Sequence, residues 1–118
     1  MKTYSDLTDN EQCALKVLVQ RLYAHCKPHI QSVTLYGSKA RGDANPDSDI
    51  DILVVLTNDD PHLRSQVRHL AARVSLEYDI LISTFAVGRS HWDELSRYRF
   101  PIYQSIQADG IDLTSAWA

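Results

Sequence analysis

The chain of 118 residues has little of what marks secreted, membrane-spanning or fibrous proteins. It contains two cysteines, four glycines and four prolines, and no apolar run approaches the roughly 18 to 20 residues that span a bilayer. The N-terminal stretch MKTYSDLTDNEQC is polar and lacks the apolar core of a signal peptide. These absences predict a cytoplasmic protein that does not act on a membrane.

Strong charge of one sign is also absent. Lysine and arginine number 12, aspartate and glutamate 15, and the formal net charge is −3. Without a block of basic residues, the sequence does not carry the electrostatic signature of a general nucleic-acid binder. We therefore expect no direct contact with nucleic acid.

The two cysteines, Cys13 and Cys26, fall within one predicted helix. Thirteen residues at about 1.5 Å each place them about 20 Å apart, which is beyond the reach of a disulfide. We expect both to be free thiols in the core.

The remaining composition, 44% apolar and 23% charged, is that of a globular protein, and the length suits a single domain over residues 1–118. Apolar spacing predicts helices over 8–26, over 39–41, from Pro61, near Ser90 and from Pro101 to Gly110. The predicted strands are 31–36, 49–56 and 78–87. Helices that alternate with strands indicate an α/β (α+β) fold with a small mixed sheet flanked by helices.

Two helix starts carry capping signals. Asp60 precedes Pro61, a favourable pair for an N-cap and the first helical position. Ser90 and Asp93 have the spacing of a capping box.

The stretch YGSKARGDANPDSDIDILVV holds the candidate chemistry. Asp49 and Asp51 open an apolar strand, and alternation directs both carboxylates to one face, roughly 7 Å apart. The opposite face takes Ile50, Ile52 and Val54. Paired carboxylates at the start of a rigid strand suit a hard cation such as Mg²⁺, which also binds water and substrate phosphate.

Gly37 and Ser38 occupy a strand-to-helix turn upstream of these aspartates. Glycine permits close approach of a ligand to the backbone, and the first N–H groups of the helix and the Ser38 hydroxyl can bind phosphate oxygens. Lys39 and Arg41 add positive charge. Chance supplies this joint pattern only about 0.004 times in a chain of this composition.

Gly37-Ser38, ten further residues and Asp49-Ile50-Asp51 together resemble the G-S-x10-D-x-D signature of the DNA polymerase β-like nucleotidyltransferase superfamily. The stretch is most similar to the minimal nucleotidyltransferases, the MNT-type proteins, and the resemblance extends from about Val33 to Leu113. It implies a mixed sheet flanked by helices and the use of ATP, or another nucleoside triphosphate, with two Mg²⁺ ions.

The resemblance also implies a role for each site residue. A third carboxylate in the family lies on a later strand beside the first two, and Asp79 in LEYDILISTF is the matching position. Asp79 would bind metal and accept the proton of the attacking hydroxyl. Catalysis and metal binding would then fall to Asp49, Asp51 and Asp79, and nucleotide binding to Gly37, Ser38, Lys39 and Arg41. Lys39 stands where many members have arginine.

MNT-type proteins act with a HEPN-domain ribonuclease toxin, so the resemblance implies an antitoxin that transfers AMP from ATP to a tyrosine hydroxyl of that partner, within a hetero-oligomer. Larger relatives add a second domain that holds the acceptor. The resemblance here ends near Leu113, so we expect the partner to bring the acceptor. Two alternatives remain open: a small-molecule nucleotidyltransferase of the aminoglycoside-modifying kind, and a non-catalytic antitoxin that acts by binding alone.

Several other residues receive a plainer interpretation. The pair Arg64/His69 is interpreted as solvated helix surface. His25 and His29 lie four residues apart, but Pro28 interrupts the helix between them, and no zinc site is expected. Asn45-Pro46 is interpreted as a turn. Aromatic residues gather in the last third of the chain, mostly as expected core, with some as an alternative partner surface: Trp92, Tyr98, Phe100, Tyr103 and Trp117.

Overall fold

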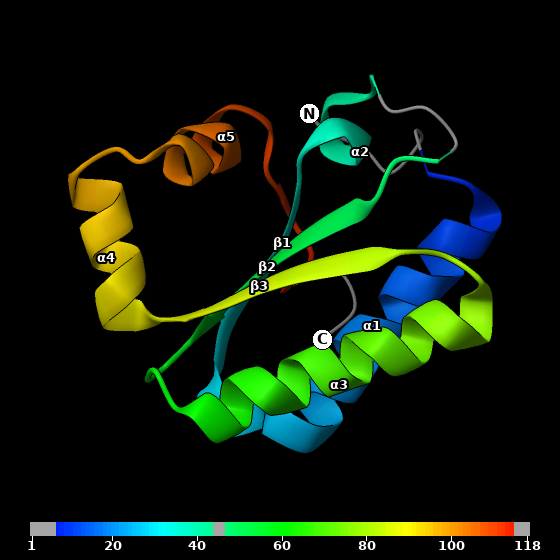
Figure 1. The fold of residues 1–118 in the computed structure, drawn as a ribbon, viewed down its shortest axis with the longest axis horizontal. Helices are drawn as coiled ribbons and strands as arrows, with labels where there is room; N and C mark the ends of the chain where they lie inside the picture. Colours follow the sequence, from blue (N-terminus) through cyan, green and yellow to red (C-terminus); the bar gives the residue numbers. More distant parts are fainter. Residues whose placement is uncertain (1–6, 44–46, 115–118) are drawn as a thin grey trace.

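The computed structural model describes residues 7–43 and 47–114 (Figure 1). The elements, in chain order, are α1 (Asp9–Cys26), the 3₁₀ helix η1 (Lys27–His29), β1 (Ile30–Tyr36), α2 (Ser38–Arg41), β2 (Ile50–Leu56), α3 (Pro61–Tyr78), β3 (Ile82–Gly88), α4 (Arg89–Arg97), α5 (Pro101–Asp109) and β4 (Ile111–Asp112). None of the described helices is both long enough and apolar enough to cross a membrane.

The four strands form one mixed sheet in the order β3-β2-β1-β4. β1 pairs antiparallel with β2 and with β4, whereas β2 and β3 run parallel. The predicted fold class is confirmed. β4 was not predicted, because two residues are too few to show an alternating pattern.

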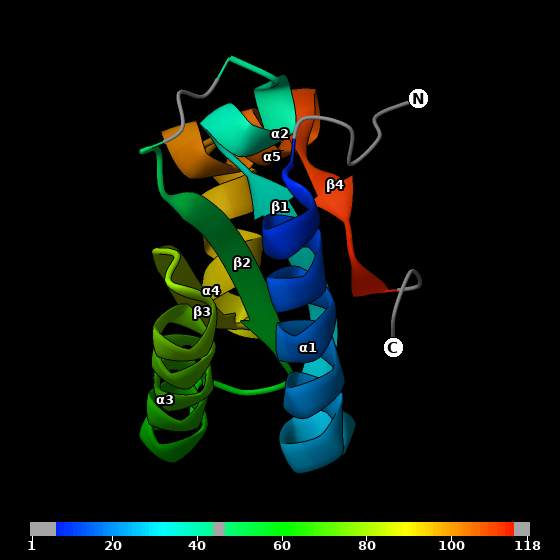
Figure 2. The ribbon, with the colours of Figure 1, turned by 90° about the vertical axis from the view of Figure 1, so that its right-hand side faces the viewer.

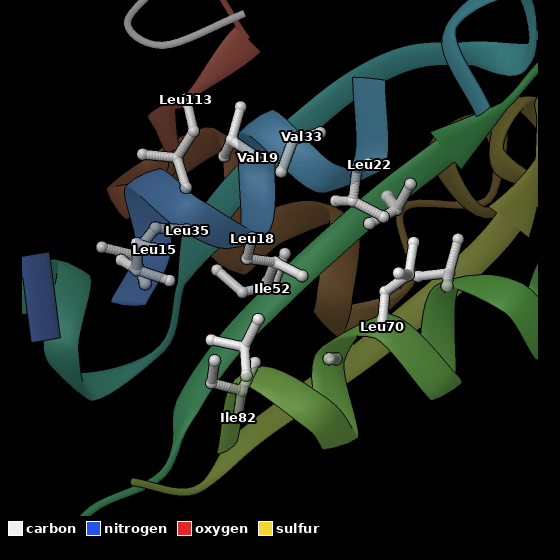
Figure 3. Close-up of a cluster of buried hydrophobic side chains, with 14 of the residues drawn as sticks. Leu15, Leu18, Val19, Leu22, Val33, Leu35, Ile52, Leu70, Ile82 and Leu113 are labelled. Atoms are coloured by element: carbon white, nitrogen blue, oxygen red, sulfur yellow. The ribbon is translucent and has the colours of Figure 1, made fainter. Parts of the chain in front are cut away.

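Helices cover both faces of the sheet (Figures 1 and 2). α1 and α3 lie on one face and bury the larger apolar cluster, which includes the predicted Ile50, Ile52 and Val54 of β2 (Figure 3). α4 and α5 lie on the other face, over a smaller cluster around Leu53 and Val55. The alternation of β2 therefore divides the core as the sequence predicted.

The apolar stripes of the two long helices, whose spacing predicted these helices, are buried. They comprise Leu15, Leu18, Leu22 and Cys26 of α1, and Leu63, Val67, Leu70 and Val74 of α3. Asp60 caps α3 as predicted, because its carboxylate accepts a hydrogen bond from the backbone N–H of His62 at 2.8 Å.

The predicted start of the third strand is wrong. α3 continues to Tyr78, and Asp79 follows as its C-cap in the left-handed conformation, with φ 53° and ψ 48°. Strand β3 begins only at Ile82, which is buried, while Leu81 and Ser83 are exposed. Tyr78, which was predicted to begin the strand, therefore belongs to α3 instead.

The predicted capping box at Ser90 is also wrong. Gly88 is the N-cap of α4 and provides no side-chain cap. Asp93 instead accepts a hydrogen bond from Nε of Arg89 at 2.9 Å, an exposed pair one helical turn apart. The box requires Ser90 before the helix, and α4 already includes it.

The cysteine and aromatic predictions hold only in part. Both thiols are free, but Cys13 is exposed and only Cys26 is in the core. Tyr98 and Phe100 are also exposed, with 67% and 48% of their surface accessible. Trp92 and Tyr103 are partly buried and face each other with ring centroids 6.1 Å apart. Trp117, Asn45 and Pro46 lie outside the described residues.

Candidate functional site

The turn after β1 meets the start of β2. In the sheet register Tyr36 pairs with Asp51, so the next residue, Gly37, lies beside the Asp51 side chain. Gly37 has φ 76°, and a Cβ placed on it would overlap Oδ2 of Asp51. Gly37 and Asp51, which belong to the two halves of the sequence motif and lie 14 positions apart in the chain, are thus in direct contact, and only glycine fits at position 37.

A single helical turn, α2, follows Gly37. The backbone carbonyl of Gly37 accepts hydrogen bonds from the N–H groups of Ala40 and Arg41. Gly42 ends the helical turn with φ 86°. Ser38 is the first residue of α2 and is partly exposed. The Ser38 hydroxyl and the first amides of the turn, which have no partner inside the helix, therefore stand next to the Gly37–Asp51 contact.

Negative charge is concentrated at this point. Asp49 is exposed immediately before β2, and Asp51 is half-buried as its second residue. Burial raises the pKa of Asp51, the charge of Asp49 raises it further, and the charge of Arg41 opposes both. Two carboxylates that repel each other beside the Gly37 turn fit a hard cation such as Mg²⁺, which would relieve the repulsion.

Arg41 is a cation close enough to lower the pKa of Asp51. Its Nε donates to Oδ2 of Asp43 at 3.1 Å, and 42% of its side chain is accessible. The guanidinium is therefore close to Asp51 and open to solvent, where an incoming anion can reach it.

Lys39 does not occupy the position expected for it. Its Nζ lies 2.8 Å from Oε2 of Glu11, and only 5% of its side chain is accessible. Although burial by itself raises the pKa of Glu11, the hydrogen bonds from Lys39 and Thr8 more than offset this and lower it. The ion pair between Lys39 and Glu11 joins α2 to the start of α1, so the ammonium group of Lys39 is paired with a carboxylate and does not face a phosphate.

Asp79 also departs from its expected position beside Asp49 and Asp51. As the cap of α3 it precedes β3, and it lines a cavity of about 360 Å³ between the ends of α1 and α3. The cavity is lined by Glu11, Asp47, Ser48, Ile50, Asp79, Ile80 and Leu81. Neither Asp49 nor Asp51 is among these residues, and the described part of the chain contains no cluster of three metal-ligating side chains.

The sequence assigned no role to three residues near the site. Ser83 is the neighbour of Asp51 on β3. Tyr36 is the neighbour on β1, and burial, followed by the charge of Asp51, raises its pKa. Glu11 forms a capping box with Thr8, and the T-x-x-E spacing in TDNE could have revealed it. Strand register, which no local pattern reveals, was needed for the other two.

Comparisons with known proteins identify the family and the fold. The model of the nucleotidyltransferase domain family matches residues 15–99. Two proteins of Methanocaldococcus jannaschii, both named as protein adenylyltransferases, are similar in sequence. One is 38% identical over 78 residues, which cover 61% of this chain and 78% of the relative. The other is 31% identical over 91 residues, which cover 77% and 87%.

Solved structures share the fold. A structure described as a minimal nucleotidyltransferase superposes with a TM-score of 0.57 at 23% identity, over 90% of this chain and 97% of that chain. A structure described as a toxin–antitoxin with AMP-PNP gives a TM-score of 0.52 at 22% identity, over 83% and 71%. With the Gly37 turn against Asp51, these matches confirm the resemblance seen in the sequence. The chain belongs to the nucleotidyltransferase domain family.

Proposed function

We propose that this nucleotidyltransferase is the antitoxin of a toxin–antitoxin pair and transfers AMP from ATP to a tyrosine hydroxyl of its partner, a HEPN-domain ribonuclease. The sequence relatives named as protein adenylyltransferases support transfer to a protein. The structural neighbour described as a toxin–antitoxin with AMP-PNP supports the kind of partner. The HEPN partner and the tyrosine acceptor come from the family resemblance.

One observation carries the proposal: the Asp51 carboxylate lies against Gly37, with Asp49 close enough to perturb it. Asp49 and Asp51 would hold Mg²⁺. When bound, the ion would neutralise negative charge on the ATP phosphates and on the departing pyrophosphate. Ser38 and the first amides of α2 would bind phosphate oxygens, and Arg41 would add a mobile positive charge.

The reaction balances without an oxidant or reductant. The tyrosine oxygen attacks the α-phosphorus of ATP and forms a phosphodiester, while the bond from that phosphorus to the bridging oxygen breaks and pyrophosphate leaves. The hydroxyl proton passes to a carboxylate of the site or to water. A tyrosine hydroxyl has a pKa near 10, so transfer at neutral pH needs such an acceptor.

The test is intact mass spectrometry of the protein encoded beside this chain, after incubation with this chain and Mg-ATP. We expect increments of the mass of AMP, located on tyrosine by peptide mapping, and none with Asp51→Asn. Asp93→Asn, which removes an exposed carboxylate on α4, is the matched control and should transfer normally. Absence of any increment with ATP or another nucleoside triphosphate would refute the proposal.

A second candidate is favoured by one observation. The residue beside Asp51 on β3 is Ser83, and the described residues hold no cluster of three metal-ligating side chains, so the expected third carboxylate is absent from the pair. A site with two carboxylates could bind nucleotide without transferring it, and the protein would then inhibit its partner by binding alone. Partner inhibition that persists in the Asp49→Asn and Asp51→Asn variants, with no AMP added, would select this function.

A further inference from the structure

A second cavity, of about 380 Å³, lies between α1 and α3. These helices cover the face of the sheet that receives Ile52 and Val54, opposite to the face of Asp51 (Figure 2). Ten residues of α1, a rise of about 15 Å, separate Arg21 in this cavity from Glu11 near the nucleotidyltransferase site. The cavity is lined by Arg21, His25, Gln66, His69, Leu70 and Arg73.

Helical spacing brings these residues together. Arg21 and His25 are four residues apart on α1, so they share one side of that helix. The residues from α3 follow the spacing i, i+3, i+4 and i+7, which is again a single stripe. Leu70, 8% accessible, anchors the stripe in the core, and the polar side chains surround it at the surface.

Every ionisable side chain that lines the cavity is basic. Arg21 is paired with Glu77, whose Oε2 lies 2.8 Å from Nη2, at the edge of the cavity. Across the described residues, the side chains of His25, His69 and Arg73 have no ion-pair or hydrogen-bond partner. The cavity beside the nucleotidyltransferase site has an acidic lining instead, with Glu11, Asp47 and Asp79. A protein of net charge −3 thus keeps an open basic cavity on its far face.

We propose that this cavity binds a phosphate group carrying more than one negative charge, as in pyrophosphate or a free nucleotide. The guanidinium of Arg73 offers parallel N–H donors that match phosphate oxygens. The imidazoles of His25 on α1 and His69 on α3 add ring N–H donors from both helices. Gln66 adds a neutral donor on the same side of α3. Arg21 and its partner Glu77 define the rim.

The experiment is an amide NMR titration of the whole chain at about pH 6 in EDTA, which removes Mg²⁺ from the other site. Sodium pyrophosphate, AMP and adenosine are added separately. We expect pyrophosphate to shift amides around 21–25 and 66–73. AMP shifting the same amides would mean that one phosphate group suffices, and AMP without effect that two are required. Shifts with adenosine alone would overturn the proposal, because it carries no phosphate.

Two variants distinguish binding in this cavity from general electrostatic attraction between phosphate and the basic residues of α3. Arg73→Gln should weaken pyrophosphate binding about 10- to 100-fold, as expected for loss of a hydrogen bond between charged groups. Arg68→Gln is the matched control, since it removes the same charge from the same helix at an exposed position that does not line the cavity. Equal weakening by both variants, or no shifts with pyrophosphate in the unmodified chain, would overturn the proposal.

Discussion

At Gly37 the residue type follows directly from two constraints. The backbone has φ 76°, and the Asp51 carboxylate occupies the space where a side chain would begin. We predict that Gly37→Ala displaces Asp51 and lowers the free energy of unfolding by about 2 to 4 kcal/mol, from left-handed strain and steric overlap combined. Gly42→Ala is the control, because Gly42 also has a positive φ, 86°, and ends α2. Urea unfolding should show the larger loss for Gly37→Ala, and an equal loss would mean that the contact with Asp51 is unimportant.

The ionised carboxylate of Asp51 destabilises the folded protein when no metal is bound. Its pKa is raised by burial and by Asp49, so its ionised form is less favourable in the folded protein than in the unfolded chain. Asp51→Asn should therefore raise the Tm of the metal-free protein by about 2 to 4 °C while abolishing AMP transfer. Calorimetry in EDTA measures the first effect. A variant that transfers AMP at the normal rate would show that Asp51 does not hold the metal.

Asp79 can be tested by the residue that its backbone favours. With φ 53°, it occupies a C-cap position where glycine is the most favourable residue. Asp79→Gly should increase the free energy of unfolding by about 0.5 to 1 kcal/mol and leave AMP transfer within a few-fold of normal. A general base would instead contribute about 10²- to 10⁴-fold to the rate. A decrease of that size in the rate of AMP transfer, measured by mass spectrometry of the acceptor, would show that Asp79 acts in the reaction.

At the scale of elements, the ion pair between Lys39 and Glu11 joins α2 to α1. Glu11→Gln preserves the capping-box shape but leaves the Lys39 ammonium buried without its partner. We predict a loss of about 2 to 4 kcal/mol in the free energy of unfolding, less than the full cost of an isolated buried charge because the fold can relax. Asp93→Asn breaks an exposed ion pair and should change the free energy of unfolding by less than about 0.5 kcal/mol. Denaturant unfolding of both variants checks the contrast.

The same pair sets an acid dependence. The pKa of Glu11 in the folded protein lies below its ordinary value of 4.5, so its contribution to stability is complete above that value. The contribution is lost as pH falls through the lowered pKa, where the carboxylate takes up a proton. The difference in unfolding free energy between the unmodified chain and Glu11→Gln should therefore shrink below about pH 4.5. A constant difference from pH 7 to pH 3 would contradict the assignment.

Local patterns predicted those elements whose residues act on near neighbours. The stripe of α3, the Asp60 cap and the alternation of β2 all depend on residues within a few positions of each other, and the structure agrees with each. The end of α3 was misplaced because YDILI is apolar in either conformation. The partner of Lys39 lies 28 positions earlier in the chain, so its burial could not be foreseen from the GSKAR stretch.

At the scale of the whole molecule, the sheet places opposite charges on different surfaces. Asp49 and Asp51 gather where β2 begins, near α2, while the basic cavity lies between α1 and α3. The sequence motif predicted the first grouping, because its spacing fixes a turn beside a strand. It did not predict the second, since Arg21 and Arg73 meet only when two helices pack on one face of the sheet. The central claim concerns the first grouping.

That claim is that Gly37-Ser38 and Asp49/Asp51 form one Mg²⁺–nucleotide site. The most direct measurement is calorimetric titration of the chain with a non-hydrolysable ATP analogue, with Mg²⁺ and with EDTA. We predict binding that requires Mg²⁺, is lost in Asp51→Asn and is unchanged in Asp93→Asn. Equal affinity for the analogue in EDTA, or in Asp51→Asn with Mg²⁺ present, would contradict the account.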